Sequence, residues 1–297
     1  MPRIAIRSGV AVRRARRLSV CLGAAAALVL TGCWSAPRPA AAPPQGPGAH
    51  DARVLPPREA ARLRAEILAG LRQRAARLRG LRGRAEVRLS APAWGGASWM
   101  ESAVVAEAPE RLRLRAYAGP TTLFDVAADG ERFWLYLPEN QMVWSGPPEA
   151  LPEITGFPGR PGDVVAALLG RPFGTPDSLD LVSVDAERAV VRWSAPGQGE
   201  VTARFQRRPL WAEEFRLARG DSLVATLSYG DYLKESVGWW PRQVTLAWPG
   251  ERATLALQFR QLELNPRVGL EVFQFAAPEG ALRVEVGAAG GRATGTP

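Results

Sequence analysis

The chain contains 297 residues, of which 46% are hydrophobic and 23% are charged, with 30 glycines, 26 prolines and two cysteines. This is the composition of a globular protein, and it excludes collagen-like, coiled-coil and disulfide-stapled proteins. The formal net charge is +9, which alone would suggest a nucleic-acid partner. The excess arginines, however, gather in two N-terminal segments, so the charge does not predict nucleic-acid binding.

The first 32 residues have the layout of an export signal. Four arginines precede an apolar run from Leu18 to Leu30, which is shorter than the roughly 20 residues of a membrane-spanning helix. The run ends in Leu30-Thr31-Gly32-Cys33, which resembles the lipobox of bacterial lipoproteins. We therefore expect residues 1–32 to be a cleaved signal peptide and Cys33 to carry the lipid. The cleaved segment holds six arginines and no acidic residue, so its removal lowers the net charge to +3.

Residues 33–57 predict a tether between the lipid and a folded domain. Proline, alanine and glycine dominate this segment and favour an extended linker. The only histidine of the chain, His50, lies within it and is expected to be solvated. Trp34 follows the modified cysteine where lipoproteins of the inner membrane usually carry Asp, which favours the outer membrane.

One long amphipathic helix is predicted from Arg58 to about Leu81. Between Arg58 and Arg84 there are nine arginines and two glutamates, a local charge of +7. The arginine face, with Arg72, Arg74 and Arg79, is open to two compatible interpretations: a solvated surface, or contact with anionic headgroups or an acidic partner. Apolar residues recur every three or four positions and form a stripe that we expect to pack on a sheet: Leu63, Ile67, Leu71, Ala75 and Leu78.

From Gly83 to Asn265 the apolar period changes to two, which predicts antiparallel strands. The segment from Arg111 to Tyr117 alternates three arginines with apolar residues, and Asp129-Gly130 predicts a hairpin turn. One short helix, Val164–Leu169 capped by Asp163, interrupts the strands. A meander of this size is expected to curl. Strands are predicted at 85–90, 98–106, 111–117, 123–127, 132–137, 142–144, 180–184, 189–193, 201–206, 211–217, 224–229, 243–248 and 254–264.

The segment Phe133–Leu137 is apolar on both faces, so either a helix or an apolar cavity must cover its second face. Nine tryptophans in the folded part fit the core of a curled sheet, and they also fit an apolar ligand pocket. Under the second interpretation, the residues expected to line the pocket are Trp99, Trp134, Tyr136, Trp144 and Trp193.

Motifs for catalysis are missing from the sequence. The folded part contains no histidine, no nucleophile elbow, no phosphate loop and no cysteine pair, so we expect no catalytic residue, metal or cofactor. Three groups of neighbouring acids keep a carboxylate-dependent hydrolase open as a minor alternative: Glu213 with Glu214, Asp125 with Asp129, and Asp185 with Glu187.

Several segments together resemble the LolA/LolB-like superfamily of outer-membrane lipoprotein carriers and receptors. They are residues 81–85 (LRGRA), 108–114 (APERLRL), 123–130 (LFDVAADG) and the C-terminal stretch from Glu263 to Gly280. The resemblance covers about residues 58–285. It implies a mainly β fold, with an incomplete barrel of about eleven strands, helices over its open side, and a cavity for acyl chains. A membrane-delivery loop of the receptor branch would correspond to residues 119–123, with Pro120 and Leu123 as candidates.

These observations predict an outer-membrane lipoprotein on the periplasmic face, anchored through Cys33. Its half-barrel, residues 58–287, is expected to bind acyl chains or lipidated proteins, and a periplasmic carrier protein is a possible partner. Residues 288–297 are expected to be a disordered tail. The alternative is a non-enzymatic interaction or stress-sensing lipoprotein of the same fold without a lipid pocket.

The lipid anchor is testable by one substitution. Cys33→Ala is expected to leave an unlipidated precursor, because Cys21 is the only other cysteine and lies in the signal peptide. Metabolic labelling with a radioactive fatty acid measures the modification. A labelled mature form of the variant would contradict the lipoprotein assignment.

Overall fold

The computed structural model describes residues 55–92, 99–171, 173–235 and 238–287. The predicted signal peptide, Cys33, most of the tether and the tail from residue 288 lie outside this part of the chain.

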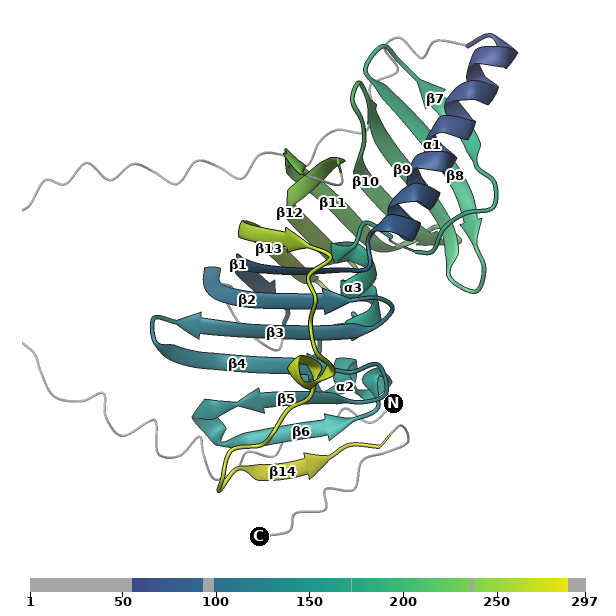
Figure 1. The fold of residues 1–297 in the computed structure, drawn as a ribbon. Helices are drawn as coiled ribbons and strands as arrows, with labels where there is room; N and C mark the ends of the chain where they lie inside the picture. Colours follow the sequence, from purple (N-terminus) through teal and green to yellow (C-terminus); the bar gives the residue numbers. More distant parts are fainter. Residues whose placement is uncertain (1–54, 93–98, 172, 236–237, 288–297) are drawn as a thin grey trace, which may run out of the picture. The chain divides into compact units, whose positions relative to one another are not determined.

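The described residues form a single curled sheet of fourteen strands with three α-helices (Figure 1). Two hairpin meanders, β1–β6 and β7–β13, join where β1 pairs with β13, and only the β14–β6 pair is parallel. The predicted mainly β, curled antiparallel fold is confirmed. The strands are β1 (Gly80–Ser90), β2 (Trp99–Glu107), β3 (Arg111–Ala118), β4 (Thr121–Ala128), β5 (Phe133–Leu137), β6 (Met142–Gly146), β7 (Asp180–Val184), β8 (Arg188–Ala195), β9 (Gly199–Arg207), β10 (Leu210–Arg219), β11 (Ser222–Glu235), β12 (Gly238–Trp248), β13 (Ala253–Leu264) and β14 (Leu282–Glu285).

Each of the thirteen predicted strands coincides with one of β1–β13, but the count of about eleven implied by the family resemblance is too low. The two meanders supply thirteen strands, and the C-terminal segment adds β14 beside β6. Period two could not reveal β14, because this short strand is mostly exposed.

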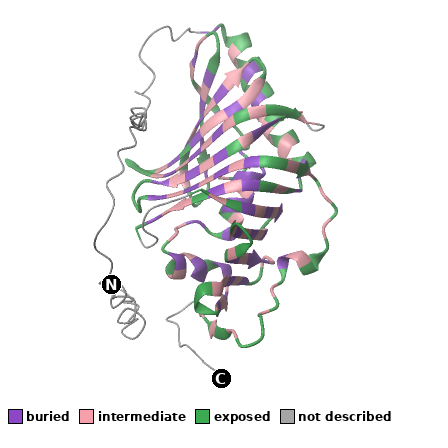
Figure 2. Ribbon diagram, turned by 90° about the vertical axis from the view of Figure 1, so that its left-hand side faces the viewer, coloured by how far each residue is buried: buried purple, intermediate pink, exposed green. Residues whose placement is uncertain are grey.

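The sheet has an inner face, which carries the main hydrophobic core, and an outer face. In β3, Leu112, Leu114 and Ala116 point inward, whereas Arg113 and Arg115 point outward. Figure 2 shows the same alternation of buried and exposed positions along many strands. The alternation arises because successive side chains of a strand project to opposite faces.

Helix α1 (Pro57–Arg77) packs on the second meander through its predicted stripe, of which Leu63 and Ile67 are buried. It is shorter than predicted, because Leu78 already has extended backbone angles and β1 begins at Gly80. In Figure 1, α1 runs across the strands β7–β9 of the second meander.

The connection between the two meanders contains α2 (Leu151–Thr155) and α3 (Pro161–Leu168), and α3 contacts strands of both meanders. The Tyr229 hydroxyl donates to the carbonyl of Ala167 at 2.6 Å, and burial raises the pKa of Tyr229, so this donor keeps its proton. Asp163 is the third residue of α3 rather than its N-cap; its carboxylate accepts from the backbone N–H of Arg160 at 2.9 Å.

Among the described residues no helix is both long and apolar enough to span a bilayer. Three short 3₁₀ helices are η1 (Pro138–Asn140), η2 (Pro148–Ala150) and η3 (Leu270–Phe273).

The C-terminal strap, residues 266–281, crosses the outer face of β3–β5. Arg113 donates to the carbonyl of Gln274 at 2.7 Å, and the ring of Phe275 lies 5.5 Å from that of Tyr136. The strap buries Phe273 completely. This cover explains why β5 is apolar on both faces.

Phe133 offers a test of the inner core. Its side chain is completely buried, so Phe133→Ala is expected to lower the free energy of unfolding by about 3–5 kcal/mol in chemical denaturation. The control Leu223→Ala removes a side chain that is 41% exposed, and it should cost about 0.5 kcal/mol or less. Equal losses for the two variants would contradict the assignment of Phe133 to the core.

Candidate functional site

An apolar pocket lies between the inner face of the first meander and the segment 151–164. The sheet forms its floor, and α2, the following loop and the start of α3 form its roof. It is lined by Leu89, Ala91, Leu112, Leu114, Phe124, Val126, Leu135, Leu151, Thr155, Phe157, Gly159, Pro161, Val164 and Leu255.

Thr155 supplies the only polar side chain of this lining, and local bonds occupy its hydroxyl. The hydroxyl donates to the carbonyl of Leu151 at 2.9 Å and accepts from the backbone N–H of Phe157 at 3.2 Å. The pocket is narrow, with a volume of about 70 Å³. Sites for drug-sized ligands are larger, about 300–1,000 Å³, so a long acyl chain fits only if the roof moves.

The roof rests on Trp248 of β12. The ring of Phe157 meets that of Trp248 edge-on at 4.7 Å between centroids. Gly159 lies so close that a Cβ atom there would be 2.7 Å from the indole, so this contact requires glycine. These contacts of the roof are therefore apolar and non-directional.

The five predicted pocket aromatics do not share a cavity. Trp134 and Tyr136 lie on the outer face, beside the strap, which corrects their predicted place in the pocket. Trp99 is 48% exposed at the start of β2, Trp193 is buried against Phe215 in the second meander, and Trp144 packs half-buried against the core. Alternation established which residues share a face, but it could not establish which face is inner.

Sequence reasoning missed most of the roof. Leu151 and Phe157 belong to a short, irregular apolar stretch with no period to identify it. The floor of the pocket could be predicted from the sequence, because Leu112 and Leu114 form the apolar face of the most regularly alternating strand.

The delivery-loop candidates occupy a tight hairpin rather than a loop. Only Gly119 and Pro120 connect β3 with β4. Pro120 is exposed at this turn, and Leu123 already belongs to β4, where it is 38% exposed.

The three predicted arginines of the basic face differ in their surroundings. Arg72 donates to the carbonyl of Asp177 at 3.0 Å. Arg74 is half-buried, with its guanidinium 5.5 Å from the centroid of the Trp240 ring, so it contributes to packing. Arg79 is exposed at the end of the helical segment. The structure therefore does not present them as one solvated face.

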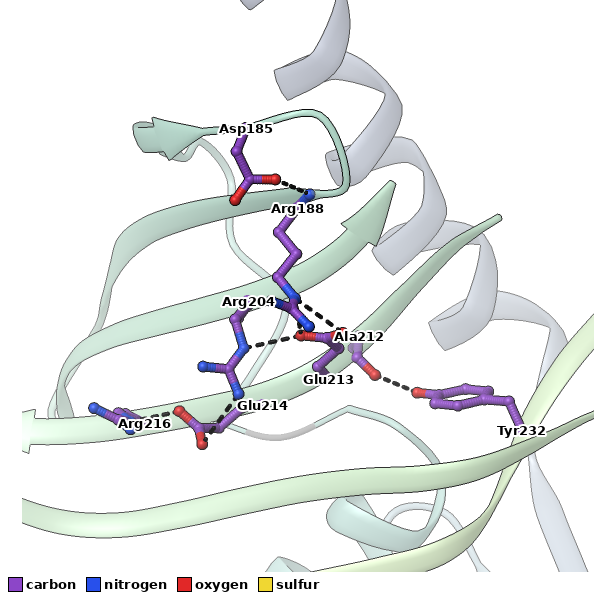
Figure 3. A network of polar contacts seen from close by, with 8 residues as sticks. All are labelled: Asp185, Arg188, Arg204, Ala212, Glu213, Glu214, Arg216 and Tyr232. Atoms are coloured by element: carbon purple, nitrogen blue, oxygen red, sulfur yellow. Dashed lines mark hydrogen bonds and ion pairs between the residues drawn. The ribbon is translucent and has the colours of Figure 1, made fainter. Parts of the chain in front are cut away.

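The acidic pair Glu213–Glu214 forms ion pairs with arginines of β8, β9 and β10 itself (Figure 3). Arg204 contacts Glu213 at 2.9 Å and Glu214 at 3.6 Å. Arg188 and Arg216 add further ion pairs, at 3.3 Å to Glu213 and 2.5 Å to Glu214. This network fixes both carboxylates on the sheet surface.

The other acidic residues also have structural contacts. Asp125 is buried and bridges Arg113 and Arg115, each at 2.6 Å. Asp129 and Asp185 each accept two backbone N–H groups within hairpin turns. No group of three metal-ligating side chains occurs within the residues that the structure describes.

No family model matches the chain, and no curated protein matches its sequence. In fold, a LolA superfamily protein from Nitrosomonas europaea is similar, with 14% identity and a TM-score of 0.48 over 71% of this chain and 97% of that chain. A domain from Vibrio parahaemolyticus named for outer membrane lipoprotein sorting has 12% identity and a TM-score of 0.48 over 72% and 97%. A DUF1329 family protein from Desulfovibrio piger has 10% identity and a TM-score of 0.45 over the same shares.

The Asp125 cluster provides a stability test. Asp125→Asn is expected to cost about 3–5 kcal/mol of unfolding free energy, because it leaves Arg113, only 14% exposed, without its carboxylate. The matched control Glu263→Gln removes an exposed partner of Arg82 and should cost about 1 kcal/mol or less. Urea denaturation of both variants measures the difference, and equal costs would contradict a structural role for the buried cluster.

Proposed function

We propose that this protein is an envelope lipoprotein that binds an acyl chain, free or attached to a lipidated protein, in the pocket under α2 and α3. The observation that carries the proposal is the lining, in which the only polar side chain, Thr155, already has local hydrogen-bond partners. Such a lining offers no free hydrogen-bonding group to a polar ligand. An acyl chain needs none, because its transfer from water to an apolar site is favourable in free energy.

The narrowness of the pocket means that the chain must displace part of the roof. Phe157 and Gly159 rest on Trp248 through apolar contacts, which an acyl chain can replace with similar ones. The sheet below is held by continuous backbone pairing. Binding therefore requires the segment 151–164 to move, while the paired strands beneath it stay in place.

The predicted lipid anchor at Cys33 and the tryptophan that follows it in the sequence support a place at the outer membrane. The proposal includes no enzymatic step, in keeping with acids that are engaged by arginines or by turn backbone. A periplasmic carrier protein would deliver the lipidated cargo.

The small pocket volume, about 70 Å³, favours one second candidate. Under it, the protein is an interaction lipoprotein of the same fold whose roof stays closed. The test below separates the two candidates.

Photo-cross-linking with a palmitate that carries a diazirine tests the acyl-chain site in the full chain. Cross-links are expected in the peptides that contain Leu112–Val126 and Leu151–Val164. Val126→Phe places a larger side chain in the empty space beside the half-buried Val126, so it should reduce cross-linking at least fivefold.

The control Val182→Phe makes the same chemical change in β7, where Val182 is 52% exposed. It should leave cross-linking unchanged. Cross-links outside the pocket peptides, or equal yields from the two variants, would exclude the acyl-chain site and favour the interaction lipoprotein.

A further inference from the structure

A basic groove lies where α1 turns into β1, apart from the apolar pocket. It has a volume of about 1260 Å³ and is formed by the end of α1, the β2–β3 turn and the residues that follow β13. Four arginines contribute to its walls, and they come from three separate parts of the chain: Arg77, Arg79, Arg171 and Arg267.

Asn265 fixes the backbone that carries two of these arginines. Its amide nitrogen donates to the carbonyl of Arg77 at 2.9 Å, and its side-chain oxygen accepts from the backbone N–H of Arg79 at 2.7 Å. Arg267 follows two residues later. The guanidinium of Arg171 reaches the carbonyl of Leu78, between the first two arginines. The four positive charges are thus assembled by the fold and do not depend on chance surface neighbours.

The lining of the groove holds four arginines and one carboxylate residue, and the carboxylate of Glu271 lies close to the lining residue Gly269. Glu107 is the only carboxylate residue of its lining, and it is paired with Arg111 at 2.6 Å. Among the described residues, no carboxylate forms an ion pair with any of the four arginines. Burial, together with repulsion from Arg79, lowers the pKa of Arg171.

A purely structural role accounts for only part of this arrangement. The terminal nitrogen of Arg171 satisfies the carbonyl of Leu78 just beyond α1, which is a common use of arginine at a helix end. Its Nε atom, however, is buried without a hydrogen-bond partner in the part of the chain that the structure describes. A buried donor of this kind is costly unless something accepts its hydrogen bond. The other three arginines of the groove are exposed, and Arg77 also donates to the side-chain oxygen of Gln73 at 3.0 Å.

We propose that this groove binds a phosphate group, either free or in an anionic lipid headgroup. Guanidinium groups match phosphate oxygens in geometry as well as in charge, and several of them around one site suit a phosphoryl group better than a single carboxylate. The site is independent of the acyl-chain proposal, because it shares no residue with the apolar pocket.

Calorimetric titration of the full chain in a neutral detergent tests the proposal, with inorganic phosphate and dihexanoylphosphatidylglycerol as separate probes at low salt. Arg79→Gln combined with Arg267→Gln should weaken binding at least tenfold, and both side chains are exposed, so the fold should persist. Arg58→Gln combined with Arg62→Gln removes the same charge from exposed positions of α1 outside the groove and should leave the affinity within twofold.

Binding of both probes supports a general phosphate site, and binding of the lipid probe alone supports a headgroup site. Arg171→Gln should weaken either form of binding as well, while circular dichroism verifies that this variant is folded. If neither probe binds, or if the groove variant and the control lose affinity equally, the proposal is overturned.

Discussion

The pairing of β1 with β13 is the interaction on which the rest of the structure depends. It joins two meanders that are otherwise built from local hairpins, over a separation of more than 160 residues. Gly83 lies at this seam, and a Cβ atom there would be 2.4 Å from the carbonyl oxygen of Gln261, so the close approach of the two strands requires glycine. The seam also brings Asn265 to the start of β1, where it organises the basic groove. A single long-range contact therefore creates both the continuous floor and the junction at α1.

The two faces of the first meander are covered by different parts of the chain. The connection with α2 and α3 covers the inner face and leaves a narrow apolar gap, whereas the C-terminal strap covers the outer face through Arg113, Phe273 and Phe275. Over the pocket, the loop that follows α2 rests on the indole ring of Trp248, whereas Arg113 holds the outer cover by hydrogen bonds to the carbonyls of Val272 and Gln274. The end of α3 is fixed by the hydrogen bond from Tyr229 to Ala167. We therefore place ligand entry at the loop between α2 and α3.

The regular parts of the fold could be predicted from the sequence, and the covers could not. Leu112, Leu114 and Ala116 reveal their strand and their shared face by simple alternation, and the stripe of α1 shows its packing side in the same way. Phe133–Leu137 signals two covered faces but not what covers them, because the strap has no period and reaches β5 only through tertiary contacts. The same limit applies to Phe157 in the roof. The basic groove is a clearer case, since Arg171 and Arg267 lie far from Arg77 in sequence. The β1–β13 seam brings the segment of Arg267 to the end of α1, and Arg171 arrives there from the end of α3.

Hydrogen–deuterium exchange of the full chain, with and without palmitate, tests the central claim that a mobile roof admits an acyl chain over a fixed floor. The account predicts that palmitate changes the exchange of backbone amides in residues 151–168, while amides of the floor strands β3 and β4 keep their rates. Unchanged exchange in residues 151–168 at saturating palmitate, or a change confined to β3 and β4, would contradict it.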